Sequence, residues 1–119
     1  MAVPFAPGDD LIFQLESGFG LLRVLAIEAR AGETVWHLLA YEDFFPDVET
    51  AEAALADASR LAVRAAHLPL TGHAFEKTPA ARLGNRPVRE DELIAYRAWS
   101  ESGDGEVFDR SALLLLGLR

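Results

Sequence analysis

The chain has 119 residues, half of them apolar and a quarter charged, with no cysteine and a formal net charge of −8. This composition is typical of one folded domain, and it excludes a disulfide framework and a cysteine-ligated zinc site. No apolar run approaches the roughly 20 residues of a membrane helix, and the first ten residues carry neither the basic nor the apolar part of a signal peptide. We therefore expect a soluble cytoplasmic protein without a membrane partner.

The charge distribution bears on the kind of partner. Nineteen acidic residues outnumber eleven basic ones, and the basic residues are scattered singly along the sequence. Such a chain repels the phosphates of nucleic acid and attracts basic proteins. We expect no nucleic-acid binding and regard a basic protein as the most suitable partner.

Three apolar runs, separated by two glycine-containing turns, occupy residues 8–41. Residues 11–15 alternate like a strand with one buried face, whereas residues 19–27 are apolar on both faces except for Arg23. Residues 34–41 are rich in β-branched and aromatic side chains, which suit a pleated, buried surface. The pattern predicts a three-stranded antiparallel meander that forms the core.

Two helices are expected after the meander. The first covers residues 48–59, with Asp47 as its N-cap. The second begins at Glu90, where three acids fill the first turn, although Arg89 makes a weak cap. The leucine-rich residues 112–116 fit a short helix or a buried strand equally well.

The segment between these helices is expected to add strands. Residues 61–68 alternate as a strand does, although their alanines also fit a continued helix, and residues 70–75 fit a second strand. Residues 78–88 contain two prolines, a glycine and an asparagine, which predict a loop. The fold class is then α+β: an antiparallel meander in a curved sheet or partly open small barrel, with two helices packed on it.

A candidate binding edge follows the third strand, where residues 41–49 read YEDFFPDVE. One reading places the three aromatic side chains in the core beneath a polar loop. The other makes the segment a partner-binding edge, with aromatic anchors inside an acidic rim. The residues of this candidate edge are Tyr41, Glu42, Asp43, Phe44, Phe45, Asp47 and Glu49.

A pocket is the alternative site. Arg23 interrupts an apolar strand, so it marks either a structural ion pair or the floor of a pocket. His37, His67 and His73 are the histidines that could exchange protons near neutral pH, and each lies in an apolar run where a structural role is the simpler reading. The pocket candidates are Arg23, His37 and His67. We find no nucleophile, nucleotide-binding or metal-binding motif, so no catalytic residue, cofactor or metal is predicted.

The opening stretch GDDLIFQLESGFGLLRVLAIE has a Gly-Asp start, an apolar strand, a glycine turn and a second strand containing Arg-Val. The corresponding positions are Gly8, Asp9, Gly18, Gly20, Arg23 and Val24. This stretch, which lies in the first quarter of the chain, resembles the start of the immunity protein 26 family of bacterial polymorphic-toxin systems. The resemblance implies a non-enzymatic cytoplasmic protein that neutralises a toxin by binding it.

Three hypotheses follow. The first is a small acidic protein-binding module, of immunity type if the resemblance holds, that uses residues 41–49. The second is a small-molecule binder or enzyme with a pocket near Arg23, His37 and His67. The third is a structural protein or homodimer without separable activity, in which the leucine-rich end or an edge strand makes the interface.

Overall fold

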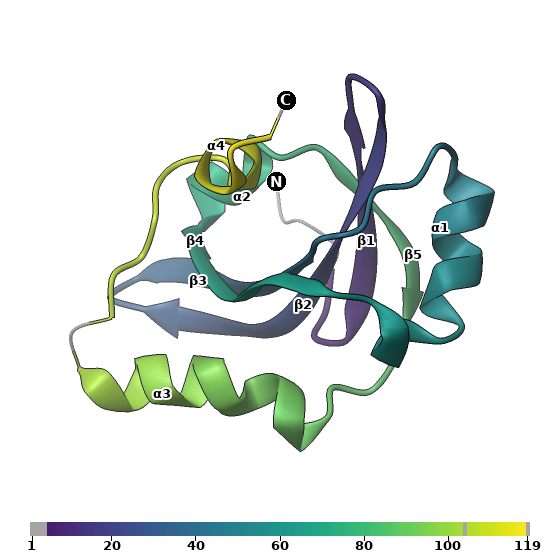
Figure 1. The fold of residues 1–119 in the computed structure, drawn as a ribbon. Helices are drawn as coiled ribbons and strands as arrows, with labels where there is room; N and C mark the ends of the chain where they lie inside the picture. Colours follow the sequence, from purple (N-terminus) through teal and green to yellow (C-terminus); the bar gives the residue numbers. More distant parts are fainter. Residues whose placement is uncertain (1–4, 104, 119) are drawn as a thin grey trace.

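The computed structural model describes residues 5–103 and 105–118. The first four residues, on which the expectation of no signal peptide partly rests, lie outside it. Its centre is a curved antiparallel sheet with the strand order β4-β3-β2-β1-β5 (Figure 1). The strands are β1 (Asp9–Leu15), β2 (Gly18–Arg30), β3 (Glu33–Tyr41), β4 (Val63–Thr71) and β5 (Ala80–Asn85). In the described part of the chain β4 and β5 do not pair with each other, so the sheet is not closed. The α+β class and the predicted meander of β1, β2 and β3 are confirmed.

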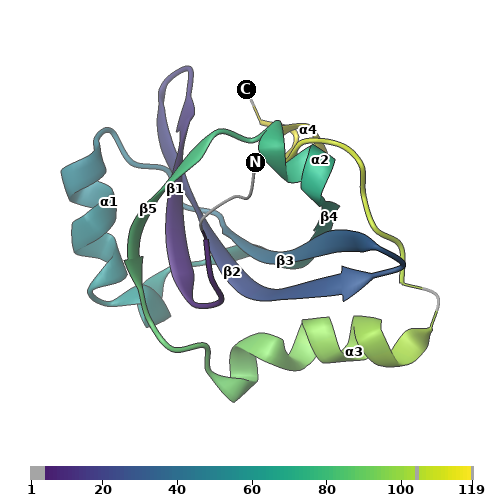
Figure 2. The same cartoon turned by 180° about the vertical axis from the view of Figure 1, so that it is seen from behind.

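Helices cover both faces of this sheet (Figures 1 and 2). They are α1 (Val48–Leu55), α2 (Gly72–Glu76), α3 (Ile94–Ser102) and α4 (Ala112–Leu116), with 3-10 turns η1 (Ala58–Arg60) and η2 (Glu90–Leu93). The two helices expected from the sequence are α1 with η1 and η2 with α3. No helix in the described residues has the length and apolar character needed to cross a membrane.

Local side chains explain where these helices start. The Asp47 carboxylate accepts the backbone N–H of Thr50 at 2.7 Å, so the predicted N-cap of α1 is confirmed. At the start of η2, Glu92 reaches back and accepts the backbone N–H of Arg89 at 3.0 Å, which compensates for the weak residue at the cap. The leucine-rich end forms the helix α4, whose N-cap is Ser111.

Two predicted elements are wrong. The strand expected over residues 70–75 ends at Thr71, because the Thr71 hydroxyl accepts the N–H of Ala74 at 3.0 Å and starts α2. The loop expected over residues 78–88 contains β5, which pairs with β1. An edge strand needs partners on one side only, and the two prolines flank β5 rather than interrupt it.

The core is divided between the two faces of the sheet. On one face, α2 and α4 cover a cluster that includes Leu22, Trp36, Leu38, Leu70 and Phe75. On the other, α1 and η2 help to cover a cluster that includes Ile12, Leu21, Leu25, Leu39 and Phe45. In Figure 1, α3 lies on the opposite side of the sheet from α2 and α4. The ion pairs of Arg23 and the contacts of His37 and His67 described below lie on the face of the second cluster.

Bulges decide which side chains reach that face. Val24 pairs with Leu38 but Ala26 pairs with His37, so β2 has one extra residue at this point. A bulge shifts the alternation of side chains by one residue. As a result Arg23 and Glu28, which a regular strand would place on opposite faces, share one face.

Candidate functional site

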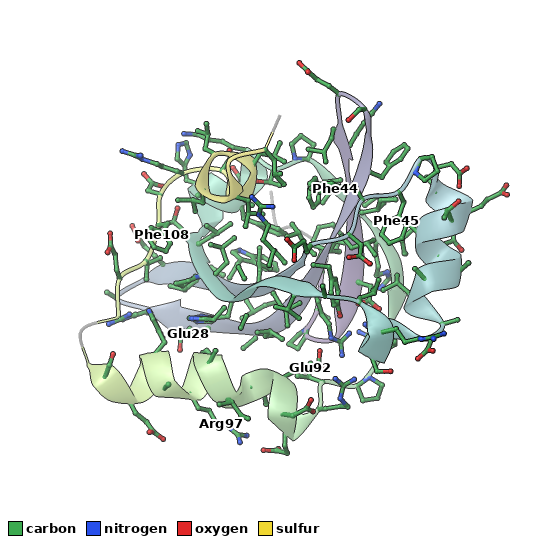
Figure 3. All side chains as sticks on the ribbon, viewed as in Figure 1. Glu28, Phe44, Phe45, Glu92, Arg97 and Phe108 are labelled. Carbon is green, nitrogen blue, oxygen red and sulfur yellow. The ribbon has the colours of Figure 1, made fainter. Side chains whose placement is uncertain are left out.

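The candidate edge over residues 41–49 separates into buried and exposed side chains. Tyr41 and Phe45 are buried, and the backbone of Phe45 pairs with that of Phe19 through hydrogen bonds of 2.8 and 2.9 Å. Phe44, in contrast, is 47% exposed. Figure 3 shows Phe44 and Phe45 on the connection between β3 and α1. Two of the three aromatics therefore belong to the core, and only Phe44 is available to a partner.

Acidic side chains surround Phe44 along the sequence. Residues 31–59 contain seven aspartates and glutamates and no lysine or arginine. Four of the carboxylates on the β3–α1 connection and on α1 are exposed, and Asp43 is half-buried. Hydrogen bonds from Thr50 lower the pKa of Asp47, so this N-cap carries a negative charge at neutral pH. We call the exposed residues of this region the acidic surface: Glu42, Phe44, Asp47, Val48, Glu49 and Glu52.

Arg23 is the centre of a buried ion-pair network. Its guanidinium group is fully buried and donates to Glu92 at 2.6 and 3.1 Å and to Asp10 at 3.2 Å. It also donates to three backbone carbonyls, those of Gly8, Arg86 and Pro87. Asp10 lies directly opposite Arg23 in the sheet, which explains their contact.

Asp10 and Glu92, the two acids of this network, have further partners besides Arg23. The side chain of Arg86 donates to both oxygens of Asp10, at 2.6 and 2.7 Å, and to the hydroxyl of Tyr41 at 3.3 Å. Burial opposes ionisation of Glu92, but the hydrogen bonds from Arg23 and the backbone outweigh it and lower the pKa of Glu92. Because its N–H groups already have acceptors, Arg23 holds β1, β2 and the β5–η2 connection together and is not free to bind a ligand.

The two other pocket candidates meet beneath α3. His37 Nδ1 lies 2.8 Å from His67 Nε2, and His37 Nε2 lies 2.9 Å from a carboxylate oxygen of Glu28. The bulge in β2 brings Glu28 to this face, and a bulge in β4 between Ala65 and Leu68 accompanies the placement of His67 beside His37. The result is a line of three titratable side chains from three neighbouring strands.

Aromatic side chains of α3 cover this line. The ring centroids of Tyr96 and Trp99 lie 4.4 and 4.9 Å from that of His37. The guanidinium of Arg30 lies 5.0 Å from the ring centre of Trp99. The pKa of Tyr96 is raised by burial and by the negative charge of Glu28. We call this group of side chains the histidine cluster: Glu28, Arg30, His37, His67, Tyr96 and Trp99.

The chemistry of the cluster follows from its hydrogen bonds. A carboxylate only accepts, so His37 donates from Nε2 to Glu28, and its Nδ1 then accepts from Nε2–H of His67. Burial lowers the pKa of His37, and burial together with the nearby charge of His37 lowers the pKa of His67 to about 4. Both rings are therefore neutral at pH 7, and the line Glu28–His37–His67 can pass a proton to or from His67.

The pocket candidates thus divide into two separate groups. Arg23 and His37 lie on the same face of the sheet, but among the described residues no hydrogen bond joins the network of Arg23 to the histidine cluster. His73 lies on α2 and is exposed. The same part of the chain contains no group of three histidine, aspartate or glutamate side chains that could hold a metal ion.

Several residues of these groups were not singled out from the sequence. They are Asp10, Glu28, Arg86, Glu92, Tyr96 and Trp99. Tyr96 and Trp99 carried a signal, because a spacing of three residues places both on one side of the predicted helix. Glu28 and Glu92 carried none, because their positions depend on a bulge and on a crossing between distant segments.

Comparison of the chain with protein-family models, with curated proteins and with solved structures finds no match, so the function is argued from these side chains.

Proposed function

We propose that the protein is a small binding module that holds a basic protein partner against the acidic surface. The observation that supports this proposal is Phe44, an exposed aromatic side chain within a 29-residue stretch that carries seven acids and no lysine or arginine. An aromatic side chain buried on association contributes apolar contact, and the surrounding carboxylates attract and orient a positively charged surface.

The position of Phe44 favours such a contact. Its neighbour Phe45 is fixed in the core and paired with Phe19, and Asp47 is fixed as the N-cap of α1. The backbone that carries Phe44 is therefore already ordered before a partner arrives. An ordered anchor loses less conformational entropy on binding than a flexible one, which strengthens the complex.

The N-terminal resemblance to the immunity protein 26 family suggests what the partner is. On this proposal the protein acts in the bacterial cytoplasm and neutralises a basic toxin by covering part of its surface. The net charge of −8 supports a basic target. Such a protein needs no catalytic residue, since inhibition follows from binding alone.

Affinity capture from cells of the native host, at low salt, tests the proposal. We expect the wild-type protein to retain a basic protein, and we expect Phe44→Ala and the double variant Glu49→Lys, Glu52→Lys to lose it. Leu114→Ala is the matched control, because Leu114 is an exposed apolar side chain on α4, outside the acidic surface. If no protein is retained, or if the acidic-surface variants retain it as well as the control does, the proposal is wrong.

One observation favours a second function, a small-molecule binder or enzyme. His37 and His67 meet, and Glu28 completes a line that could carry a proton. In an NMR titration with small molecules extracted from the host, a ligand at this site would shift the ring resonances of His67 but not those of His73. Unchanged His67 resonances at saturating extract would contradict this second function.

A further inference from the structure

A cleft opens on the same face of the sheet as the histidine cluster. Its volume is about 330 Å³, and it lies between η1, the start of β4 and the first turn of α3. Its lining is mostly apolar and includes Leu39, Tyr41, Leu61, Val63, Ile94 and Ala95. A cleft of this volume is at the lower end of the range of ligand sites. It is large enough for a single apolar side chain.

The mouth of the cleft exposes apolar surface to solvent. Val63 is 47% exposed and Ile94 is 67% exposed, and both line the cleft. Exposed aliphatic side chains next to a concave apolar surface are typical of interaction sites. Arg89 and Asp91 form an exposed ion pair at the rim. Because exposed ion pairs contribute little free energy, a partner could replace Arg89 as the cation beside Asp91.

The cleft lies next to both ends of the chain segment that carries the acidic surface. Tyr41 forms part of the lining and immediately precedes Glu42, with which the acidic surface begins. Ala58 and Ser59 form another part of the lining and follow Asp57 directly. The segment that carries the acidic surface therefore begins and ends near the cleft, and the backbone N–H of Glu42 donates to the carbonyl of Ala62 at 2.9 Å. A partner that extends from the acidic surface past either end of this segment would reach the cleft.

We infer that the cleft receives one apolar side chain from a basic segment of the partner, while flanking basic side chains replace Arg60 beside Asp57 and Arg89 beside Asp91. This inference rests on the proposed function and names how the same partner is gripped. Interfaces gain most of their affinity from a few side chains buried in pockets and surrounded by a polar rim. The cleft provides such a pocket, and the exposed ion pairs Arg60–Asp57 and Arg89–Asp91 provide such a polar rim.

Other occupants fit the cleft less well. A second copy of this chain would bring another net charge of −8 to a protein that already carries −8, and the two copies would repel each other. An added strand along β4 is disfavoured, because β4 has two irregularities in its pairing with β3 between Val63 and Leu68. Such irregularities protect sheet edges against pairing.

Two short peptides test the inference with the full chain. One contains a leucine between two pairs of lysines, and the other has alanine in place of the leucine. At low salt we expect the leucine peptide to bind at least about tenfold more tightly, because burial of one leucine side chain supplies that difference. In NMR spectra only the leucine peptide should shift the methyl resonances of Val63, Ala66 and Ala95, which line the cleft.

Cleft-filling variants provide the second part of the test. Ala95→Phe places a ring in the cleft, whereas Ala98→Phe places the same ring on an exposed position of α3. We expect the preference for the leucine peptide to disappear in Ala95→Phe and to remain in Ala98→Phe. Ala66→Phe fills the cleft from β4 and replaces Ala95→Phe if that variant does not fold.

The outcomes separate the inference from the proposed function. Equal affinity for the two peptides, without shifts of the cleft methyl groups, would overturn the inference and leave the acidic surface intact as a binding site. If neither peptide binds at low salt, both the inference and the proposed attraction of basic partners are wrong. If the preference for leucine survives in both cleft-filling variants, the leucine binds elsewhere and the inference is also wrong.

Discussion

His37 and His67 share one hydrogen bond of 2.8 Å between their rings, and the other ring nitrogen of His37 is bound to Glu28. The pair can hold one added proton, because His67 can change tautomer and accept the bond from His37. A second proton would place two N–H groups against each other. Arg30, on the same strand as Glu28, adds another positive charge near the rings. We therefore expect the contact between α3 and the sheet to depend on pH.

We expect stability to fall as the pH is lowered from about 6.5 to about 4. The pKa of His67 is about 4 in the folded chain and close to its ordinary value of about 6.5 in the unfolded chain. The unfolded chain takes up this proton first, so acid favours unfolding across that interval. Because His67 is partly exposed, the expected loss of unfolding free energy is about 1–2 kcal/mol.

Urea unfolding between pH 7 and pH 4 measures this effect, with the fluorescence of Trp99 followed in a Trp36→Phe background. His67→Gln keeps a donor for His37 but does not titrate, so its pH dependence should be weaker. His73→Gln, which replaces an exposed histidine on α2, should behave like the wild type. Equal pH dependence in the three proteins would show that the His37–His67 pair does not control the acid response.

Arg23→Met should be strongly destabilising. The substitution removes the guanidinium group, so the buried carboxylates of Asp10 and Glu92 each lose one positively charged partner. Loss of one member of a buried ion pair costs about 3–5 kcal/mol. The matched control is Arg97→Met, which removes an exposed ion pair with Glu90 and should change stability little. Chemical denaturation of both variants gives the comparison, and similar losses would mean that the Arg23 network contributes little to stability.

The neighbouring residues Phe44 and Phe45 should respond in opposite ways to truncation. Phe45→Ala removes a buried ring and should cost about 3–5 kcal/mol of unfolding free energy. Phe44→Ala removes a half-exposed ring and should change stability by no more than about 0.5 kcal/mol. Thermal and urea unfolding measure both. A large loss for Phe44→Ala would assign Phe44 a structural role and weaken its assignment as a binding anchor.

Gly20 is expected to tolerate no larger side chain. It pairs with Phe13 across β1 and β2, and a Cβ at this position would lie 2.4 Å from the nearest atom of the Phe13 ring. Gly20→Ala should therefore cost about 1–3 kcal/mol, as overpacking does. Gly84 also lies in a strand, but the space that an added methyl group would occupy there is open, so Gly84→Ala should be neutral or slightly stabilising. The reverse order of stabilities would contradict the packing between β1 and β2.

The sequence determined the parts of the fold that depend on neighbouring residues. The alternation of apolar residues and the glycine turns predicted β1, β2 and β3, and Asp47 predicted the start of α1. These signals are local because side-chain alternation and helix capping involve residues that are close in the chain. The acidity of the region after β3 and its aromatic residues were also evident, although not which of Phe44 and Phe45 is exposed.

Tertiary structure alone decided the partners of the charged and titratable residues. Arg23 was visible as an exception in an apolar strand, but its main partner Glu92 is 69 residues away. The contact of Glu28 with His37 depends on a bulge that changes which side of β2 faces α3. Pairing between distant strands and bulges arise from packing of the whole sheet, and a local pattern of residues does not encode either of them.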